Sequence, residues 1–161
     1  SIRRHEDNIV VIDDSIVRGT TLKQSVIRIL DRLEPKKIII VSSAPQIRYP
    51  DCYGIDMAKL GDFIAFQAAI ALIQDNGKQT LLDEVYKTCK EAEKNGSLKS
   101  ENFVKKIYEP FTYQQVSDKV SALLTHKDIN AGVQIIFQKV EDLHEACPGN
   151  TGDWYLSLIH I

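Results

Sequence analysis

Residues 9 to 21 read IVVIDDSIVRGTT: a short apolar run, two aspartates, and a loop of small and hydroxyl-bearing residues. The run at 9–12 is continuous and β-branched, which predicts a strand buried on both faces of a parallel sheet. A helix is expected next and should end at Pro35, because apolar residues recur at three- and four-residue steps. These residues are Leu22, Val26, Ile29, Leu30 and Leu33. A second buried strand is predicted at 38–41, which completes a right-handed βαβ unit.

The rest of the chain predicts further helices and one more strand. Residues 44–61 contain two prolines and two glycines and are expected to be loop-like. A helix is expected at 63–74, and residues 78–130 look like a helical insert with solvated Lys/Glu faces. We expect a third strand at 133–137 and a closing helix at 140–147, which makes the chain an α/β protein. Three strands are few for a complete doubly wound sheet, so we expect further strands N-terminal to this chain.

Composition bounds the classes of function. The chain has 161 residues with 20 Lys+Arg and 22 Asp+Glu, for a formal net charge of -2. This length suits one domain with a real core. Nucleic-acid binding by bulk charge is not expected, although the composition leaves a local basic patch open. The sequence has no apolar run of about 18 residues, so we expect no membrane association through a spanning helix.

The three cysteines, Cys52, Cys89 and Cys147, are widely spaced and form no C-x-x-C motif. This pattern predicts neither a disulfide framework nor a zinc knuckle. Reduced thiols indicate a cytoplasmic protein. We expect Cys52 and Cys147 to be packed thiols.

Both ends of the chain suggest a fragment. The only methionine is Met57, so the first residue is not a translation start. Residues 156–161 read LSLIHI and match the translation of a common sequencing adapter, so we expect a non-native tail. The alternative for this tail is a terminal edge strand.

The residues after the first strand point to a phosphate and sugar site. In an open parallel sheet, ligands bind beyond the carboxyl ends of the strands. Asp13 and Asp14 lie at this point, and Gly19, Thr20 and Thr21 precede the helix. Free N–H groups at a helix start favour a phosphate, and paired carboxylates can accept hydrogen bonds from sugar hydroxyls. The alternative is structural, with the aspartates as capping residues and Gly-Thr-Thr as a plain turn. The spacing of a Walker loop is absent.

The same stretch resembles the phosphoribosyl pyrophosphate signature of type I phosphoribosyltransferases. The SIVRGTT version is most similar to the glutamine amidophosphoribosyltransferase family. SAPQIRYP at 43–50 and YGIDM at 53–57 are similar to the segment that follows the next strand in that family. GDWY at 152–155 also fits. The resemblance covers about residues 1–75 and 132–155.

This resemblance implies a partial type I phosphoribosyltransferase fold. Residues 1–155 would be the C-terminal part of that domain, with the helical insert at about 78–130. The implied substrate-binding residues are Asp13, Asp14, Ser15, Ile16, Val17, Arg18, Gly19, Thr20 and Thr21. The two aspartates would hold the ribose hydroxyls and help to place Mg²⁺ through the bound substrate, and residues 15–21 would bind the 5-phosphate.

The implied reaction is displacement of pyrophosphate from phosphoribosyl pyrophosphate by glutamine-derived ammonia. It gives phosphoribosylamine, the first step of de novo purine synthesis. The glutaminase nucleophile belongs to a separate N-terminal domain, so we expect this fragment to be inactive alone. The resemblance also implies purine nucleotide inhibitors and a homo-oligomer. Some members carry an iron–sulfur cluster, but Cys52 is one residue away from the ligand position and the later paired cysteines are missing. We expect no cluster.

The sequence is also compatible with two other functions. One is a salvage phosphoribosyltransferase that uses a free base, which the segments at 43–50 and 53–57 disfavour. The other is a phosphoribosyl pyrophosphate sensor that binds nucleic acid, which the net charge disfavours. Arg48 also has two interpretations: contact with a phosphate or nucleotide, or a pair with a loop carboxylate such as Asp51.

Overall fold

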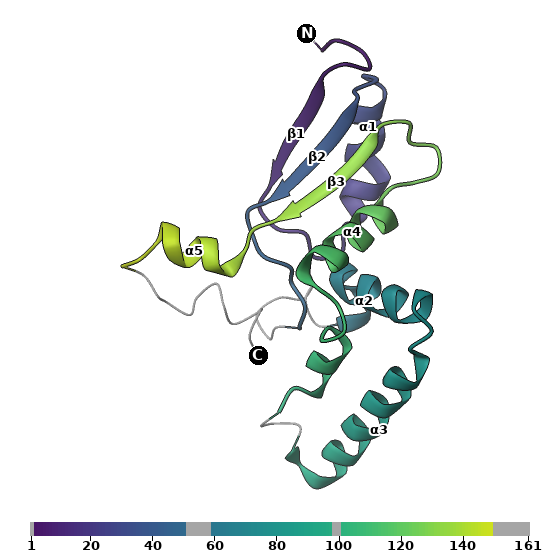
Figure 1. Ribbon diagram of the computed structural model, residues 1–161, viewed down its shortest axis with the longest axis vertical. Helices are drawn as coiled ribbons and strands as arrows, with labels where there is room; N and C mark the ends of the chain where they lie inside the picture. Colours follow the sequence, from purple (N-terminus) through teal and green to yellow (C-terminus); the bar gives the residue numbers. More distant parts are fainter. Residues whose placement is uncertain (1, 51–58, 98–100, 150–161) are drawn as a thin grey trace.

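The computed structural model describes residues 2–50, 59–97 and 101–149. Its centre is a parallel three-stranded sheet in the order β1 (Asn8–Asp13), β2 (Lys37–Ser42) and β3 (Gly132–Phe137) (Figure 1). The strands are in register, so that Ile40 of β2 lies between Val11 and Ile135. This arrangement confirms the α/β class and is consistent with part of a phosphoribosyltransferase domain.

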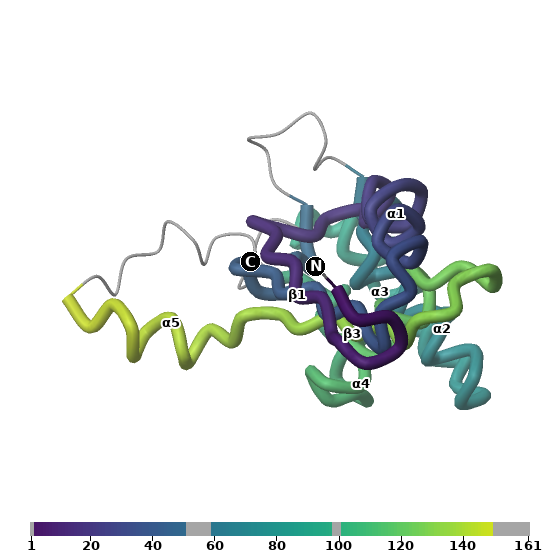
Figure 2. The backbone as a smooth tube through the Cα atoms, turned by 90° about the horizontal axis from the view of Figure 1, so that it is seen from above, coloured from purple at the N-terminus to yellow at the C-terminus, as the bar shows by residue number. Residues whose placement is uncertain are grey.

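Eight helical elements connect and flank the described strands. In chain order they are η1 (Leu22–Val26), α1 (Ile27–Asp31), η3 (Leu60–Asp62), α2 (Ile64–Asp75), α3 (Gln79–Asn95), η5 (Phe103–Ile107), α4 (Tyr113–Leu124) and α5 (Val140–Ala146). In Figure 1, α3 extends downward away from the sheet. Both Figure 1 and Figure 2 show α5 projecting to the opposite side from the other helices. The predicted helices at 63–74 and 140–147 are thus confirmed as α2 and α5.

The core lies between one face of the sheet and the helices α1, α2 and α4. Ile38 and Ile40 of β2 and Ile135 of β3 point into it at the two-residue period of a strand. The helical residues buried in it include Ile27, Ala65, Ala68, Ala69, Ile73, Val116, Val120 and Leu124. Each large aliphatic side chain buried here contributes about 1.5 to 3 kcal/mol. The packing therefore fixes α4 as part of the core.

The prediction that the first strand is buried on both faces is wrong for the described residues. Val10 and Ile12 of β1 are 59% and 77% exposed, and Ile136 of β3 is 43% exposed. Ile12 and Ile136 flank Val41 in the register, so they share one face of the sheet. The apolar pattern alone could not reveal this, because a continuous apolar run is the same whether or not a second layer covers the sheet.

The predicted stripe of the first helix is shifted in phase. Ile29 and Leu33 are 58% and 45% exposed, whereas Ile27, outside the predicted stripe, is fully buried. The cause is η1, a π-helical turn over Leu22–Val26. A π turn holds more than 3.6 residues, so it rotates every later side chain around the helix axis. As a result, Leu22 and Ile27 are the buried residues of this segment.

The segment 78–130 contains two different kinds of helix. α4 packs against α2 and β3 under the sheet, and it begins with a capping box between Thr112 and Gln115. α3 packs mainly on η5 and ends at Gly96, whose φ of +75° suits a left-handed helix cap. Tyr86 of α3 is 65% exposed. The outer boundaries of the insert stay a prediction.

The two described cysteines differ in their exposure. Cys89 and Cys147 are unpaired thiols, but Cys147 is exposed, so its prediction as a packed thiol is wrong. It lies just beyond α5, a helix with no buried residue. Cys52 and residues 156–161 lie outside the described residues.

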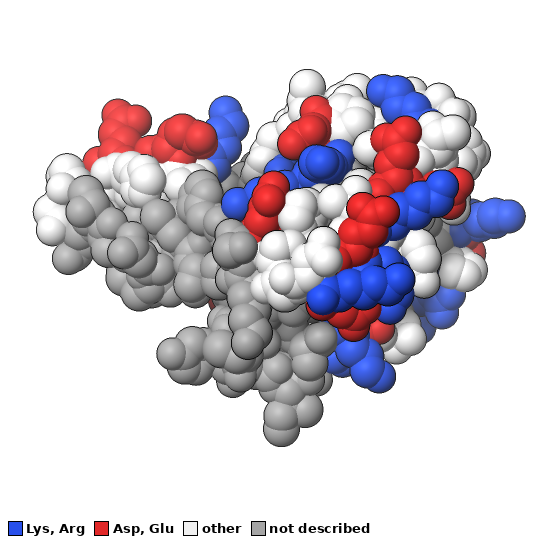
Figure 3. Space-filling model, turned by 90° about the horizontal axis from the view of Figure 1, so that it is seen from below, with Lys and Arg blue, Asp and Glu red and all other residues white. Residues whose placement is uncertain are grey.

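Among the residues described, none of the helices is long and apolar enough to cross a membrane. Figure 3 shows basic and acidic side chains interspersed over the described part of one face.

Candidate functional site

A cavity of about 640 Å³ lies at the carboxyl end of β1. Eight of the nine predicted site residues line it: Asp13, Ser15, Ile16, Val17, Arg18, Gly19, Thr20 and Thr21. The exception is Asp14, which is exposed at the rim of the turn. The structure therefore brings the first aspartate and the whole loop around one hollow, at the edge of the sheet where α/β proteins bind ligands.

The two aspartates differ in their surroundings. Burial raises the pKa of Asp13, and a hydrogen bond and the charge from Asp14 raise it further. Asp14 accepts a hydrogen bond at 2.8 Å from the backbone N–H of Ser15, the local turn interaction kept open as the alternative role. The charged form of Asp13 is disfavoured in the protein without ligand, so a bound cation or hydroxyl donors would stabilise that charged form. The pair is thus chemically suited to a sugar or metal ligand.

Ser43, directly after β2, holds the backbone of the acidic pair. Its hydroxyl donates to the carbonyl oxygens of Asp13 and Asp14, both at 3.1 Å, and its N–H donates to the carbonyl of Asp13 at 2.9 Å. These contacts fix where β1 ends and where the two carboxylates begin. Ser43 did not figure among the predicted site residues, although a hydroxyl residue directly after the neighbouring parallel strand was a usable signal.

Gly19 is the turning point of the loop. Its φ is +69°, a left-handed conformation that glycine adopts at low cost. A Cβ at this position would lie 2.6 Å from Cδ2 of Leu124, a fully buried residue of α4. The carbonyl of Gly19 accepts from the N–H of Lys23 at 3.0 Å, so the helix starts directly behind the loop. The N–H groups of its first turn lack helical acceptors and lie where an anion would be favoured.

Two further contacts hold the loop from the side of α2. The N–H of Ile64 donates to the carbonyl of Val17 at 2.8 Å. Arg18 pairs with Asp62 of η3 at 3.6 Å, with both side chains partly exposed, so this ion pair contributes little to stability. Ile16 is 2% exposed, and its side chain belongs to the core. Any contact between Ile16 and a phosphate therefore runs through its backbone.

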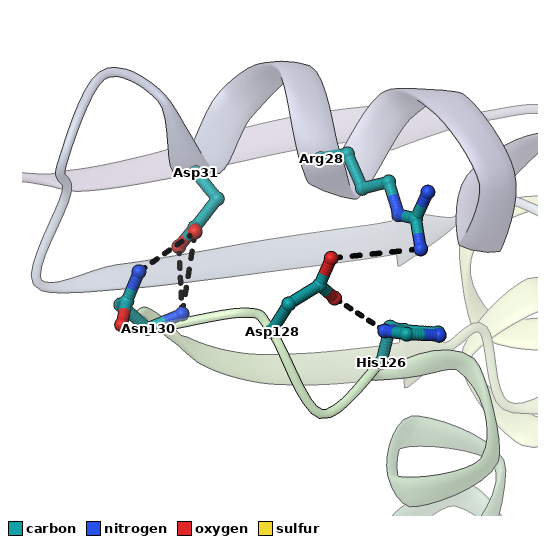
Figure 4. A network of polar contacts seen from close by, with 5 residues as sticks. All are labelled: Arg28, Asp31, His126, Asp128 and Asn130. Atoms are coloured by element: carbon teal, nitrogen blue, oxygen red, sulfur yellow. Dashed lines mark hydrogen bonds and ion pairs between the residues drawn. The ribbon is translucent and has the colours of Figure 1, made fainter.

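The helix behind the loop is also tied to the turn that leads into β3 (Figure 4). The carboxylate of Asp31 in α1 accepts from the backbone N–H groups of Asn130 and Ala131, at 3.1 and 2.8 Å. Arg28 pairs with Asp128 at 3.6 Å, and Asp128 also contacts His126. The contacts of Asp31 and Arg28 join residues about 100 positions apart and connect α1 to the turn before β3.

The donor set limits the metal chemistry. Among the described residues, no three His, Cys, Asp or Glu side chains come together as a metal-binding group. Asp13 and Asp14 supply two carboxylates, which suits Mg²⁺ because this ion is commonly held by one or two carboxylates together with substrate phosphates. The residues present thus fit a metal that arrives with its substrate.

Part of the chain is similar in sequence to known amidophosphoribosyltransferases. No protein-family model matches the sequence. Amidophosphoribosyltransferases of Pasteurella multocida and Escherichia coli are 46% and 45% identical over 61 and 60 residues. These matches cover 38% and 37% of this chain and 12% of each relative. The amidophosphoribosyltransferase of Schizosaccharomyces pombe is 33% identical over 93 residues, 55% of this chain and 17% of that relative.

The chain thus spans only about 12 to 17% of the length of these curated relatives. The sequence identity, the parallel sheet and the acidic pair before a glycine–threonine loop agree with one another. The chain is similar to a fragment of the amidophosphoribosyltransferases, and its described residues form an α/β unit consistent with part of their phosphoribosyltransferase domain.

Proposed function

We propose that this chain forms part of the phosphoribosyl-transfer site of an amidophosphoribosyltransferase. In the whole protein, ammonia derived from glutamine would displace pyrophosphate from phosphoribosyl pyrophosphate, giving phosphoribosylamine for purine synthesis. The observation that carries this proposal is the cavity at the end of β1, which gathers Asp13 and the loop up to Thr21. The names of the similar proteins agree with it.

The loop would bind the 5-phosphate. Gly19, Thr20 and Thr21 line the cavity at the start of a helix, where the first backbone N–H groups have no helical acceptor. Such groups are donors for an anion, and the helix dipole adds to the attraction. The hydroxyls of the two threonines can donate further hydrogen bonds. The contacts of Gly19 with Leu124 and of Val17 with Ile64 hold this arrangement before the phosphate arrives.

The acidic pair would orient the ribose. Carboxylates accept hydrogen bonds from vicinal hydroxyls; Asp13 lines the cavity, and the exposed Asp14 is the next residue in the chain. When bound with the pyrophosphate, Mg²⁺ would neutralise the charge of the leaving group, and the two aspartates are the residues that would help to hold it. The negative carboxylates also favour the positive character that develops on the sugar ring as the bond to pyrophosphate breaks.

This half-reaction needs no side-chain nucleophile. Positioning of the sugar and electrostatic complementarity carry the rate enhancement, because ammonia itself attacks the anomeric carbon. Glutamine hydrolysis would take place in another part of the whole protein. We further propose a cytoplasmic homo-oligomer that responds to purine nucleotides and holds no iron–sulfur cluster, with neither nucleic acid nor membrane as a partner.

The test uses the whole protein that contains this chain. In the double variant Asp13→Asn/Asp14→Asn, we expect phosphoribosylamine formation to fall at least about 100-fold, while glutamine hydrolysis persists. The matched control is Asp83→Asn/Asp142→Asn, which removes two exposed aspartates of α3 and α5. The control should keep full transfer activity. Normal product formation by the Asp13/Asp14 variant would refute the role given to this pair.

A further inference from the structure

A second cavity, of about 630 Å³, lies beyond the carboxyl ends of β2 and β3. One wall is the segment that follows β2, with Gln46, Arg48 and Tyr49. The other walls come from residues 105–113 and from the start of α5. Among the described residues, the two large cavities share no lining residue. This cavity is therefore a separate feature of the same edge of the sheet.

The guanidinium of Arg48 is fixed on the wall of this cavity. Its central carbon lies 4.7 Å from the ring centre of Tyr108 and 5.5 Å from that of Tyr113. Its Nε and Nη2 donate to Oε1 of Gln46 at 3.1 and 2.8 Å. Stacking and hydrogen bonding together leave this cation little rotational freedom, so a ligand would not have to order it.

The partner that orients Arg48 is itself locked. Gln46 is fully buried, and its Nε2 donates to the carbonyl of Tyr113 at 2.9 Å and to the hydroxyl of Ser117 at 2.8 Å. The hydroxyl of Tyr108 donates to the carbonyl of Arg48 at 3.1 Å. A charged group supported by a buried second layer of hydrogen bonds is the arrangement that binding sites need for precision.

The charge on Arg48 is not neutralised by a described carboxylate. The arginine ion pairs of the described residues involve Arg3, Arg4, Arg18 and Arg28. Lys105 and Lys139 add two basic groups to the cavity wall, and Glu109 and Glu141 add two acidic ones. With Arg48, the lining has three basic groups against two acidic groups, an excess of one positive charge. Such a cavity favours a small anion over a neutral or cationic ligand.

The remaining wall is aromatic. Tyr49 is 5% exposed and packs edge-on against Tyr108, with ring centres 5.8 Å apart. Burial raises the pKa of Tyr49 and of Tyr108, so both phenols stay neutral at physiological pH. Phe111 lines the cavity as well. These rings offer an apolar surface next to a fixed cation.

We propose that this cavity binds a small organic anion, with its carboxylate or phosphate head on Arg48 and its apolar body against Phe111 and Tyr49. This site does not depend on the transfer reaction proposed above. The competing explanation is that Arg48 serves only to join the segment after β2 to α4. The two explanations differ in whether a free anion enters the cavity.

The test is a titration of the full chain with benzoate and with phenyl phosphate, followed by NMR signals of Phe111 and Tyr49. Benzamide, which is nearly isosteric with benzoate but neutral, is the matched control ligand. We expect both anions to shift these signals and to bind at least about tenfold more tightly than benzamide, because a charged hydrogen bond is lost with the amide. Phenyl phosphate can also enter the loop cavity, but its effect there falls on the signals of Gly19 and Thr20.

Variants separate the cation from general packing. Arg48→Lys keeps the charge but loses the planar fork, and should weaken benzoate binding about tenfold. Lys139→Gln should weaken it about two- to fivefold, whereas Lys106→Gln, beside Lys105 but outside the cavity lining, should leave it unchanged. Equal binding of benzoate and benzamide, or no shift of the Phe111 and Tyr49 signals at about 20 mM ligand, would overturn the proposal. If Arg48→Lys does not fold, the proposal is still tested by comparing benzoate with benzamide and Lys139→Gln with Lys106→Gln.

Discussion

Gly19 lies against Leu124, so closely that a methyl group on Gly19 would come within 2.6 Å of the leucine side chain. The first residue belongs to the candidate phosphate loop and the second to α4, more than 100 residues later in the chain. Leu124 is fully buried and cannot move aside without disturbing the core. The conformation of the loop is therefore set by the packing of a helix that contributes no side chain to the loop cavity.

Gly19→Ala should destabilise the fold by about 2 to 4 kcal/mol, since it combines a left-handed backbone with a steric clash. Gly77→Ala is the matched control, because Gly77 has a φ of +65° but nothing within 4 Å of the added carbon. The control should cost only about 1 to 2 kcal/mol. Chemical denaturation of both variants measures the difference. Equal losses of stability in the two variants would show that the clash with Leu124 does not contribute to the effect of Gly19→Ala.

The double variant Gly19→Ala/Leu124→Ala tests the same contact by coupling. Leu124→Ala alone should cost about 2 to 5 kcal/mol, because it leaves a cavity in the core. In the double variant the smaller side chain makes room for the new methyl group, so the combined loss should be about 1 to 2 kcal/mol less than the sum of the single losses. Simple additivity of the two losses would contradict the steric account.

Asp13→Asn should stabilise the chain at neutral pH while it weakens ribose phosphate binding. Burial and the neighbouring Asp14 raise the pKa of Asp13, so the folded state holds its proton to a higher pH than the unfolded state does. The free energy of unfolding therefore falls as pH rises from the ordinary aspartate range, about pH 4, through the raised pKa. Thermal melts of the wild type and the variant between about pH 3 and pH 7 test this. A variant that is less stable than the wild type at pH 7 would refute it.

Gln46→Leu should destabilise the fold by about 1 to 3 kcal/mol, because it removes the hydrogen-bonding partner of Arg48 and Ser117 inside the core. Gln79→Leu, an exposed glutamine at the start of α3, is the control and should change stability by less than about 0.5 kcal/mol. Denaturation midpoints give both values. A loss at Gln46 no larger than that at Gln79 would mean that this buried network contributes nothing.

The sequence predicted the structure best where neighbouring residues alone determine it. The apolar runs before Asp13 and Ser42 predicted parallel strands, because continuous β-branched residues suit a sheet covered by helices. The loop residues after Asp13 were predicted to form one site, and the structure places all but Asp14 around one cavity. Whether that cavity binds a ribose phosphate stays a prediction.

What the sequence missed depends on contacts between distant residues. A π-helical turn moved burial from Ile29 to Ile27, and no propensity signals such a turn. Similarly, nothing local links Gly19 to Leu124, or Gln46 to Ser117, because α4 lies in a segment whose sequence shows only amphipathic helices. Only the tertiary structure shows that α4 contacts both the loop after β1, at Gly19, and the segment after β2, at Gln46.

Ribose phosphate binding by the loop after β1 can be measured by titrating this chain with ribose 5-phosphate and following the backbone amide signals of Gly19, Thr20 and Thr21. We predict saturable shifts of these signals, with weaker binding in Asp13→Asn/Asp14→Asn than in the matched Asp83→Asn/Asp142→Asn variant. Unchanged loop amides at saturating ligand, or equal binding by the two double variants, would contradict it.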